Sequence, residues 1–212
     1  MKIAFLFYDN MTALDAIGPH EVLGRLPNAE VFRVAQKAGK IRTCLGLELL
    51  ADYSFSDVQQ ADVLCIPGAG NATTLRKFPE TLEWIRQIHQ TTTYTTSVCT
   101  GSLILAAAGL LNGVNATTHW AVMNNLAKLG AIPKHERVVE SGKIITAAGV
   151  SAGIDMALLL AAKIAGETVA RTLQLGIEYD PHPPFDSGSP EKVEPALREA
   201  LQKRLLSKFE AL

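Results

Sequence analysis

The chain has 212 residues, of which 48% are hydrophobic and 19% are charged, and its formal net charge is −1. This composition is typical of a globular protein with one sizeable core, and it predicts a single domain over residues 1–212. The 20 basic and 21 acidic residues form no Lys/Arg cluster, which argues against a nucleic-acid partner. No run of about 18 apolar residues could cross a membrane, and no signal-like cleavage region follows Met1, so we expect a cytoplasmic protein.

Strands and helices alternate from the N-terminus onward. Strands are predicted over 3–7, 29–35, 41–44, 47–50 and 63–66, and helices over 12–23 and 82–89. Thr12 is a candidate cap of the first helix, and Asp15 stands at capping-box spacing from it. The same helix carries an apolar stripe of Leu14, Ile17 and Val22, which is either a contact with a second copy or a buried core face.

The alternation continues in the C-terminal half. The predicted elements are a strand over 93–98, helices over 101–108 and about 119–129, a loop over 112–117, a hairpin of 137–140 with 143–147, and helices over 151–164 and 168–176. A proline- and glycine-rich loop over 179–190 is expected to follow the protein surface. A final amphipathic helix over 191–212 has Leu197, Leu201 and Leu205 on one stripe. This order predicts an α/β fold, with a mostly parallel sheet and helices on both faces.

Cys99 lies where a strand pattern changes abruptly into a helix pattern. The β-branched run 93–98 precedes it, and the helix-forming run 101–108 follows. A tight turn of this kind holds a side chain over the N-terminus of the next helix, where the dipole and free N–H groups favour a thiolate. Thr100 and Gly101 are small enough for a sharp bend, and Gly101 tolerates unusual backbone angles. Cys99 is therefore either a reactive thiol or a small buried hydrophobe.

The remaining cysteines and histidines give no sign of a metal site. Three cysteines without ligand spacing argue against a disulfide framework and against a zinc knuckle. Cys44 and Cys65 lie in apolar, strand-like runs, where we expect a structural role. Four histidines are scattered and predicted to lie at the surface: His20, His89, His135 and His182. We therefore expect neither a metal nor an organic cofactor.

Four loops follow predicted parallel strands, so they should meet beyond the carboxyl ends of the sheet. They carry Asp15, the segment 68–70, Cys99 and the segment 149–151. The sequence thus predicts a thiol, a carboxyl group and anion-holding backbone N–H groups in one place. The segment 68–70 is too short for either nucleotide fingerprint, so no phosphate cradle is expected.

Several motifs along the chain together carry a family resemblance. They include Asp15-Ala16-Ile17-Gly18-Pro19, Ile66-Pro67-Gly68-Ala69-Gly70, Ser97-Val98-Cys99-Thr100-Gly101, Thr117-Thr118-His119-Trp120 and Ala147-Ala148-Gly149-Val150-Ser151. With them the chain resembles the ThiJ/PfpI superfamily almost end to end. The likeness is strongest to isonitrile hydratases, which share the Tyr-Asp-Pro-x-Pro-Pro-Phe-Asp-x-Gly-Ser-Pro segment found here at 179–190. The resemblance implies a flavodoxin-like fold, similar to class I glutamine amidotransferases, and a homodimer.

The resemblance also implies roles in isonitrile hydration. Cys99 as thiolate would attack the terminal carbon of the small-molecule substrate, and Asp15 would act as general acid and then as general base for water. Backbone N–H groups of Gly70 and Thr100 are candidates to hold the carboxyl group or the hydrated intermediate, and Val150 is expected beside the sulfur. The candidate site comprises Cys99, Asp15 and Thr100 as catalytic residues, with Gly68, Gly70, His119, Gly149 and Val150 around the substrate.

Three positions compare this chain with other branches of the superfamily. Thr100 stands where protease- and amidase-like members usually place a histidine, so their Cys–His pair is missing. Asp15 stands where glyoxalase-like members typically place a glutamate, and its reach is shorter. His119 matches a histidine that some glyoxalase-like members use, and either helix capping, a core hydrogen bond or catalysis could account for it here.

Three other functions stay open at this point. A glyoxalase or deglycase could use Cys99 with Asp15 or His119 as base. A redox sensor could oxidise Cys99 to a sulfinate that the carboxyl group hydrogen-bonds. A ligand-binding regulatory domain is the third, because relatives occur fused to helix-turn-helix regions; with one helix over 191–212 at its end, this chain is expected to lack such a module.

Overall fold

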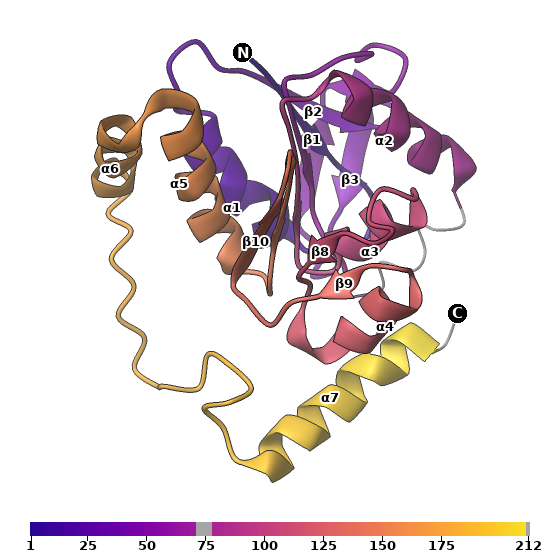
Figure 1. Cartoon of the computed structure of the whole chain (residues 1–212). Helices are drawn as coiled ribbons and strands as arrows, with labels where there is room; N and C mark the ends of the chain where they lie inside the picture. Colours follow the sequence, from indigo (N-terminus) through magenta and orange to yellow (C-terminus); the bar gives the residue numbers. More distant parts are fainter. Residues whose placement is uncertain (71–77, 211–212) are drawn as a thin grey trace.

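A seven-stranded sheet forms the centre of the structure (Figure 1), a computed structural model that describes residues 1–70 and 78–210. The strands are β1 (Lys2–Leu6), β2 (Glu30–Ala35), β5 (Tyr53–Ser54), β6 (Val63–Ile66), β7 (Tyr94–Val98), β10 (Val138–Ser141) and β11 (Ile144–Ala147). Their order is β10-β11-β7-β6-β1-β2-β5. All neighbours are parallel except β10 and β11, which form the predicted antiparallel hairpin.

The described helices are α1 (Ala13–Leu23), α2 (Pro79–Thr91), α3 (Gly101–Ala107), α4 (Met123–Lys128), α5 (Ala152–Ala165), α6 (Glu167–Gly176) and α7 (Pro195–Glu210). Of these, α1 and α5 pack on one face of the sheet, and α2 and α3 pack on the other. Along β1, Ile3 and Phe5 pack in the cluster that contains α1 and α5, whereas Ala4 and Leu6 pack in the cluster that contains α2 and α3. Because successive strand residues face opposite sides, a strand covered on both faces reads as one apolar run. The predicted α/β fold is confirmed.

Several short elements escaped prediction or differ from it. The predicted loop 112–117 contains β8 (Asn115–Ala116), which pairs in parallel with β9 (Ile132–Pro133), and two residues are too few to show a period. The predicted helix over 119–129 is divided into η2 (Trp120–Val122) and α4. A separate antiparallel pair, β3 (Gly39–Arg42) with β4 (Glu48–Ala51), begins and ends within a few residues of the two predicted strands.

The C-terminal arm, defined as residues 179–194, does not follow the surface as expected. Figure 1 shows it leaving α6 and running away from the sheet before the chain returns as α7. Residues 180–188 are exposed, and Phe185 keeps 76% of its surface accessible. Leu206 of α7 packs against the core, but Leu197 of the predicted stripe is 55% exposed. Residues 211–212 of the predicted helix lie outside the described residues.

Other predictions of exposure and burial are corrected. Cys44 is exposed rather than buried, because it lies in the turn between β3 and β4. Val22 of the apolar stripe on α1 lies in the core, as expected for a buried core face, whereas Leu14 is 44% exposed. Only part of the stripe is therefore a core face. His20 and His89 are half-buried rather than at the surface.

That the 212 residues form one domain stays a prediction. Among the described residues, no helix has both the length and the apolar character needed to span a bilayer.

The turn from β7 into α3 depends on glycine for a different reason than expected. The positive φ of +56° falls on Cys99, and Gly101 is needed because α3 begins against the end of β6. A Cβ on Gly101 would lie 2.3 Å from the carbonyl oxygen of Ile66. Backbone cannot yield as a flexible side chain can, so Gly101 fixes where the helix starts.

Gly101→Ala tests this close approach. We expect the variant to lose about 1–3 kcal/mol of unfolding free energy in urea denaturation, because α3 must shift away from β6. Gly70→Ala is the matched control: its Cβ would meet no described atom within 4 Å, so we expect a change within about 0.5 kcal/mol. Equal losses in the two variants would contradict the steric argument.

Candidate active site

The strand order explains why distant residues meet. After β1 the chain builds the sheet outward through β2 and β5, and it then returns to place β6 on the other side of β1. Ligands of open α/β sheets bind beyond the carboxyl ends of strands at such a reversal. Asp15 follows β1, Gly68 follows β6, and Cys99 follows β7, the next strand along. The predicted convergence of these three residues is therefore confirmed.

Cys99 is held in its strained conformation by hydrogen bonds to its own backbone. Its N–H donates to the carbonyl oxygens of Ala147 at 3.1 Å and Ala148 at 2.8 Å. Its carbonyl oxygen accepts from the hydroxyls of Thr118 at 3.0 Å and Ser102 at 3.2 Å. A non-glycine residue with positive φ persists only where the surroundings over-determine it, and such positions cluster at functional sites.

Asp15 is a buried partner of the thiol rather than a helix cap. Its carboxyl group is 2% exposed, and Oδ2 accepts the Gly68 N–H at 2.9 Å. Oδ1 is buried and makes no well-directed hydrogen bond within the described residues, while the Cys99 thiol lies close enough to lower the pKa of this carboxyl group. Burial outweighs both hydrogen bonds and raises the pKa of Asp15 from 3.8 to about 7. Thr12 makes no side-chain cap, so the capping-box prediction is wrong.

The protonation of Cys99 depends on the same burial. With 5% of its surface accessible, desolvation raises the pKa of the thiol, and the neighbouring Asp15 charge raises it further. The backbone N–H groups of Thr100 and Val150 act in the opposite direction but do not outweigh burial. The backbone N–H groups thus favour the thiolate as expected, but burial and the Asp15 charge outweigh them. A thiolate forms here only when Asp15 holds the proton, because two negative charges cannot share the site.

The glycine-rich loop after β6 is fixed to this pair by Thr100. The Thr100 hydroxyl donates to the Ala69 carbonyl oxygen at 2.7 Å and accepts the Ala69 N–H at 2.8 Å. It also lies near the sulfur, but its single proton already goes to Ala69, which leaves the sulfur to backbone donors. The N–H that meets the carboxyl group belongs to Gly68, whereas Gly70 is exposed and has no hydrogen bond to Asp15 or Cys99 within the described residues. The expectation for Gly70 is thus replaced by Gly68.

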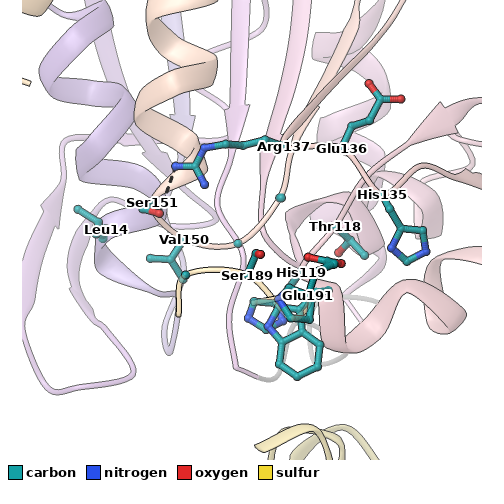
Figure 2. Close-up of a pocket in the computed structure, with 15 residues that line it drawn as sticks. Leu14, Thr118, His119, His135, Glu136, Arg137, Val150, Ser151, Ser189 and Glu191 are labelled. Carbon is teal, nitrogen blue, oxygen red and sulfur yellow. Dashed lines mark hydrogen bonds between the residues drawn. The ribbon is translucent and has the colours of Figure 1, made fainter. Parts of the chain in front are cut away.

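A cavity of about 430 Å³ lies on the Val150 side of the thiol, and neither Cys99 nor Asp15 is among the described residues that line it. Gly149 and Val150 line it, and Figure 2 shows Leu14 and Val150 on one side and His119 on the other. The Val150 N–H lowers the pKa of the Cys99 thiol, which agrees with the expected place of this residue near the sulfur. The full lining is Leu14, Thr118, His119, Trp120, His135, Glu136, Arg137, Ala148, Gly149, Val150, Ser151, Gly188, Ser189, Pro190 and Glu191.

His119 caps a helix and also lines the cavity. Its Nδ1 accepts the Ala121 N–H at 3.3 Å, so the expected capping role is present. Burial lowers the pKa of His119, which keeps the ring neutral near pH 7. A neutral ring that accepts at Nδ1 carries its hydrogen on Nε2. His119 therefore brings a neutral N–H donor to the cavity, with Nε2 3.7 Å from the position that a Cβ on Gly149 would take.

Two residues of the site escaped the sequence analysis. Tyr8 donates to the Pro67 carbonyl oxygen at 2.9 Å; burial first, and then the charges of Asp15 and Cys99, raise its pKa well above the usual value. It comes directly after the residues of β1, so its position at a strand end was the available signal. Thr118 lies in a loop, and its hydroxyl donates to the Cys99 carbonyl oxygen. No sequence pattern predicts this hydrogen bond. Within 1–70 and 78–210, no three His, Cys, Asp or Glu side chains gather as a metal site would need.

These features define a doubly wound α/β protein with a cysteine at a strand-to-helix turn. The model of the DJ-1/PfpI family matches residues 1–163, and the chain belongs to that family. The isonitrile hydratase of Pseudomonas putida is 43% identical over 204 residues, which cover 96% of this chain and 90% of the relative. A crystal structure of a ThiJ/PfpI family protein from Pseudomonas syringae matches with a TM-score of 0.94 at 38% identity, over 97% of this chain and 86% of that one.

A regulator is also among the relatives. The HTH-type transcriptional regulator CdhR of Pseudomonas aeruginosa is 28% identical over 167 residues, which cover 76% of this chain. The match spans 48% of the regulator, so half of that protein has no counterpart here. The hydratase, in contrast, matches over nearly all of its length.

Asp15→Asn separates the charge of this carboxyl group from its hydrogen bond to Gly68. Because the pKa of Asp15 rises from 3.8 to about 7 on folding, the folded protein binds a proton that the unfolded chain has lost between these values. The stability from that proton is complete below about pH 4 and is lost as the pH rises through about 7, by up to roughly 4 kcal/mol. The asparagine variant lacks this loss.

The measurement is urea denaturation of both proteins between pH 4 and pH 8. The unfolding free energy of the parent minus that of Asp15→Asn should decrease with pH and level off above about 7. A difference that stays constant, or that increases with pH, would show that Asp15 is not held protonated by burial.

Proposed function

We propose that the protein hydrates isonitriles to N-substituted formamides, with Cys99 as nucleophile and Asp15 as general acid and base. The observation that carries this proposal is the buried pair itself, a thiol beside a carboxyl group whose pKa burial raises to about 7, with a cavity lined by the neighbouring Gly149 and Val150. The 43% identity to the isonitrile hydratase of Pseudomonas putida, over most of both chains, supports the substrate class.

The first half of the reaction joins the substrate to the enzyme. Ionised Asp15 takes the proton of the Cys99 thiol, and the thiolate attacks the terminal carbon of the isonitrile. A C–S bond forms, and the lone pair that develops on the carbon takes the proton from Asp15. The product is a thioimidate, R–N=CH–S–Cys99, and Asp15 is again a carboxylate.

The second half releases the product with water. Asp15 takes a proton from water as the oxygen attacks the thioimidate carbon, and that proton goes to the nitrogen. The C–S bond then breaks, the oxygen gives up its hydrogen, and Cys99 recovers its proton. The sum is R–NC + H₂O → R–NH–CHO, which needs neither an oxidant nor a cofactor.

Four N–H donors would stabilise the charges that pass through the site. The backbone N–H groups of Thr100 and Val150 lower the pKa of the Cys99 thiol, and they would stabilise the thiolate both before attack and on departure. The Gly68 N–H holds the Asp15 carboxyl group in place. The neutral His119 ring, with its hydrogen on Nε2, is the donor available to the nitrogen or oxygen of the intermediate.

The assay follows formamide formation from an aromatic isonitrile by proton NMR. We expect turnover by the parent chain, none by Cys99→Ala, and about 10²–10⁴-fold less by Asp15→Asn, because general acid–base catalysis is worth that much. Cys44→Ala removes an exposed thiol outside the site and is the matched control, with activity retained. Turnover that survives Cys99→Ala would sink the covalent mechanism.

The same assay separates the alternatives. A parent chain that leaves isonitrile intact but consumes methylglyoxal through Cys99 would be a glyoxalase or deglycase. A chain that binds a formamide without turning over any isonitrile would be a ligand-binding domain, as the similarity to a transcriptional regulator allows. Oxidation of Cys99 by peroxide in the absence of either activity would favour a redox sensor.

The pH dependence of turnover tests the role of Asp15 in the free enzyme. Proton abstraction from Cys99 needs ionised Asp15, whose pKa is about 7. We expect kcat/KM to rise about tenfold per pH unit below that value and to level off above it. A profile that falls with increasing pH from 5 to 8 would mean that the protonated acid, rather than the carboxylate, is needed at the start.

We further propose that two copies of the chain associate, as the family resemblance implies. Light scattering of the purified protein measures this association: a mass near 46 kDa, twice the 22.8 kDa of one chain, is expected. A mass of one chain at assay concentration would refute it.

A further inference from the structure

Three side chains hold the loop that carries Val150, and one of them, Arg137, also lines the cavity. We call Arg137, Asp155 and Tyr179 the clamp. Arg137 precedes β10, Asp155 lies in the first turn of α5, and Tyr179 is the first residue of the C-terminal arm. These positions lie on three separate segments, and none of them belongs to the reacting pair.

The clamp closes on the start of α5. Arg137 donates through Nε to one oxygen of Asp155, and through Nη2 to the Ser151 hydroxyl at 3.4 Å, a contact drawn in Figure 2. The Tyr179 hydroxyl donates to the other oxygen of Asp155 at 2.8 Å. The backbone of Tyr179 is itself fixed, because its N–H donates to the Gln174 carbonyl at 3.0 Å and its carbonyl accepts from the Gln174 side chain at 3.1 Å.

A short chain of bonds leads from the clamp to the sulfur. The Arg137 carbonyl oxygen accepts the Ala148 N–H at 2.9 Å, and the Ala148 carbonyl oxygen accepts the Cys99 N–H at 2.8 Å. Ser151 directly follows Val150, whose N–H lowers the pKa of the Cys99 thiol. Arg137 therefore contacts the loop on both sides of Val150, through its backbone carbonyl at Ala148 and through its side chain at Ser151.

Stability alone does not explain this arrangement. The side chains of Arg137 and Asp155 are 51% and 30% exposed, and ion pairs that water reaches contribute little to folding. Position is a different matter: a donor displaced by a fraction of an ångström from a thiolate loses much of its effect. Tyr179 of the clamp is also the first residue of the C-terminal arm, and residues 188–191 of that arm line the cavity.

We infer that Arg137, Asp155 and Tyr179 are positioning residues that hold the Val150 N–H against the Cys99 sulfur and link the C-terminal arm to the reactive thiol. The inference rests on the proposed function only in taking Cys99 as the reactive group. Its test therefore uses a reaction of the thiol itself and needs no isonitrile.

The probe is iodoacetamide, which alkylates the thiolate, and the full-length chain carries Cys44→Ser so that the exposed thiol does not compete. Alkylation of Cys99 is followed by mass spectrometry of its peptide from pH 6 to pH 10. We expect Arg137→Ala and Asp155→Asn to slow alkylation at pH 8 by about tenfold, and Tyr179→Phe by about threefold, as expected for weakened hydrogen bonds to a charged group. The rate reached at high pH should fall with each, because the thiolate loses a donor, whereas the pH midpoint should stay at the titration of Asp15.

Matched variants distinguish positioning from general damage. Arg25→Ala breaks an exposed pair with Glu21, and Tyr53→Phe removes a hydroxyl far from Cys99, so both should leave the rate and the midpoint unchanged. Arg137→Lys keeps a positive charge beside Asp155 but lacks the second donor to Ser151. We expect this variant to recover part of the alkylation rate that Arg137→Ala loses. Melting temperatures of Arg137→Ala and Arg137→Lys should agree within about 2 °C.

The inference is overturned if Cys99 in the clamp variants is alkylated at a rate within twofold of the parent. It is also overturned if the alkylation rate falls in proportion to melting temperature in the clamp and control variants alike. Isonitrile turnover is recorded separately. A parent chain without turnover but with slowed alkylation in the clamp variants would reject the proposed function and keep this inference. Normal isonitrile turnover with unchanged alkylation in the clamp variants would keep the proposed function and reject this inference.

Discussion

The position of one proton between two buried acids governs this site. Asp15 and Cys99 are 2% and 5% exposed, and they lie close together beyond β1 and β7, the strands on either side of β6. Water that would stabilise either charge is excluded, so each acid keeps its proton more tightly than usual and the pair holds at most one negative charge. In the proposed mechanism, a shared proton of this kind would let the same carboxylate act as a base for the thiol and, once protonated, as an acid for the substrate. The chemistry needs no further titratable group.

Bringing these two side chains together imposes a steric condition on the backbone. A Cβ on Gly68 would lie 2.6 Å from the Thr100 nitrogen and 2.9 Å from the Asp15 carboxyl oxygen. Glycine at this position and at Gly101 therefore lets two strand ends and one helix start occupy the same small volume. The doubly hydrogen-bonded Thr100 then fixes the loop, so the site is pre-organised by close packing as much as by charge.

The sequence carried the fold and the reacting pair because both follow from local pattern and one general rule of sheets. Alternating apolar runs and helix periods predict the elements, and residues that end parallel strands meet at one edge. That rule stops short of geometry. It named Gly70, whereas the N–H that meets the carboxyl group lies two residues earlier, at Gly68. A helix N-terminus predicted a thiolate at Cys99, but burial decides its protonation and is invisible in a local pattern.

Contacts between distant side chains were beyond any pattern. Arg137 and Asp155 are 18 residues apart, and Tyr179 lies 24 residues beyond Asp155. Their meeting depends on how α5 packs on the sheet and on where the C-terminal arm leaves α6. The arm then returns to the cavity, whose floor exposes Val150 rather than the sulfur. In the proposed reaction, the terminal carbon of the isonitrile would have to pass Val150 to reach the sulfur, because Cys99 does not line the cavity. The larger N-substituent would remain in the cavity of about 430 Å³ above.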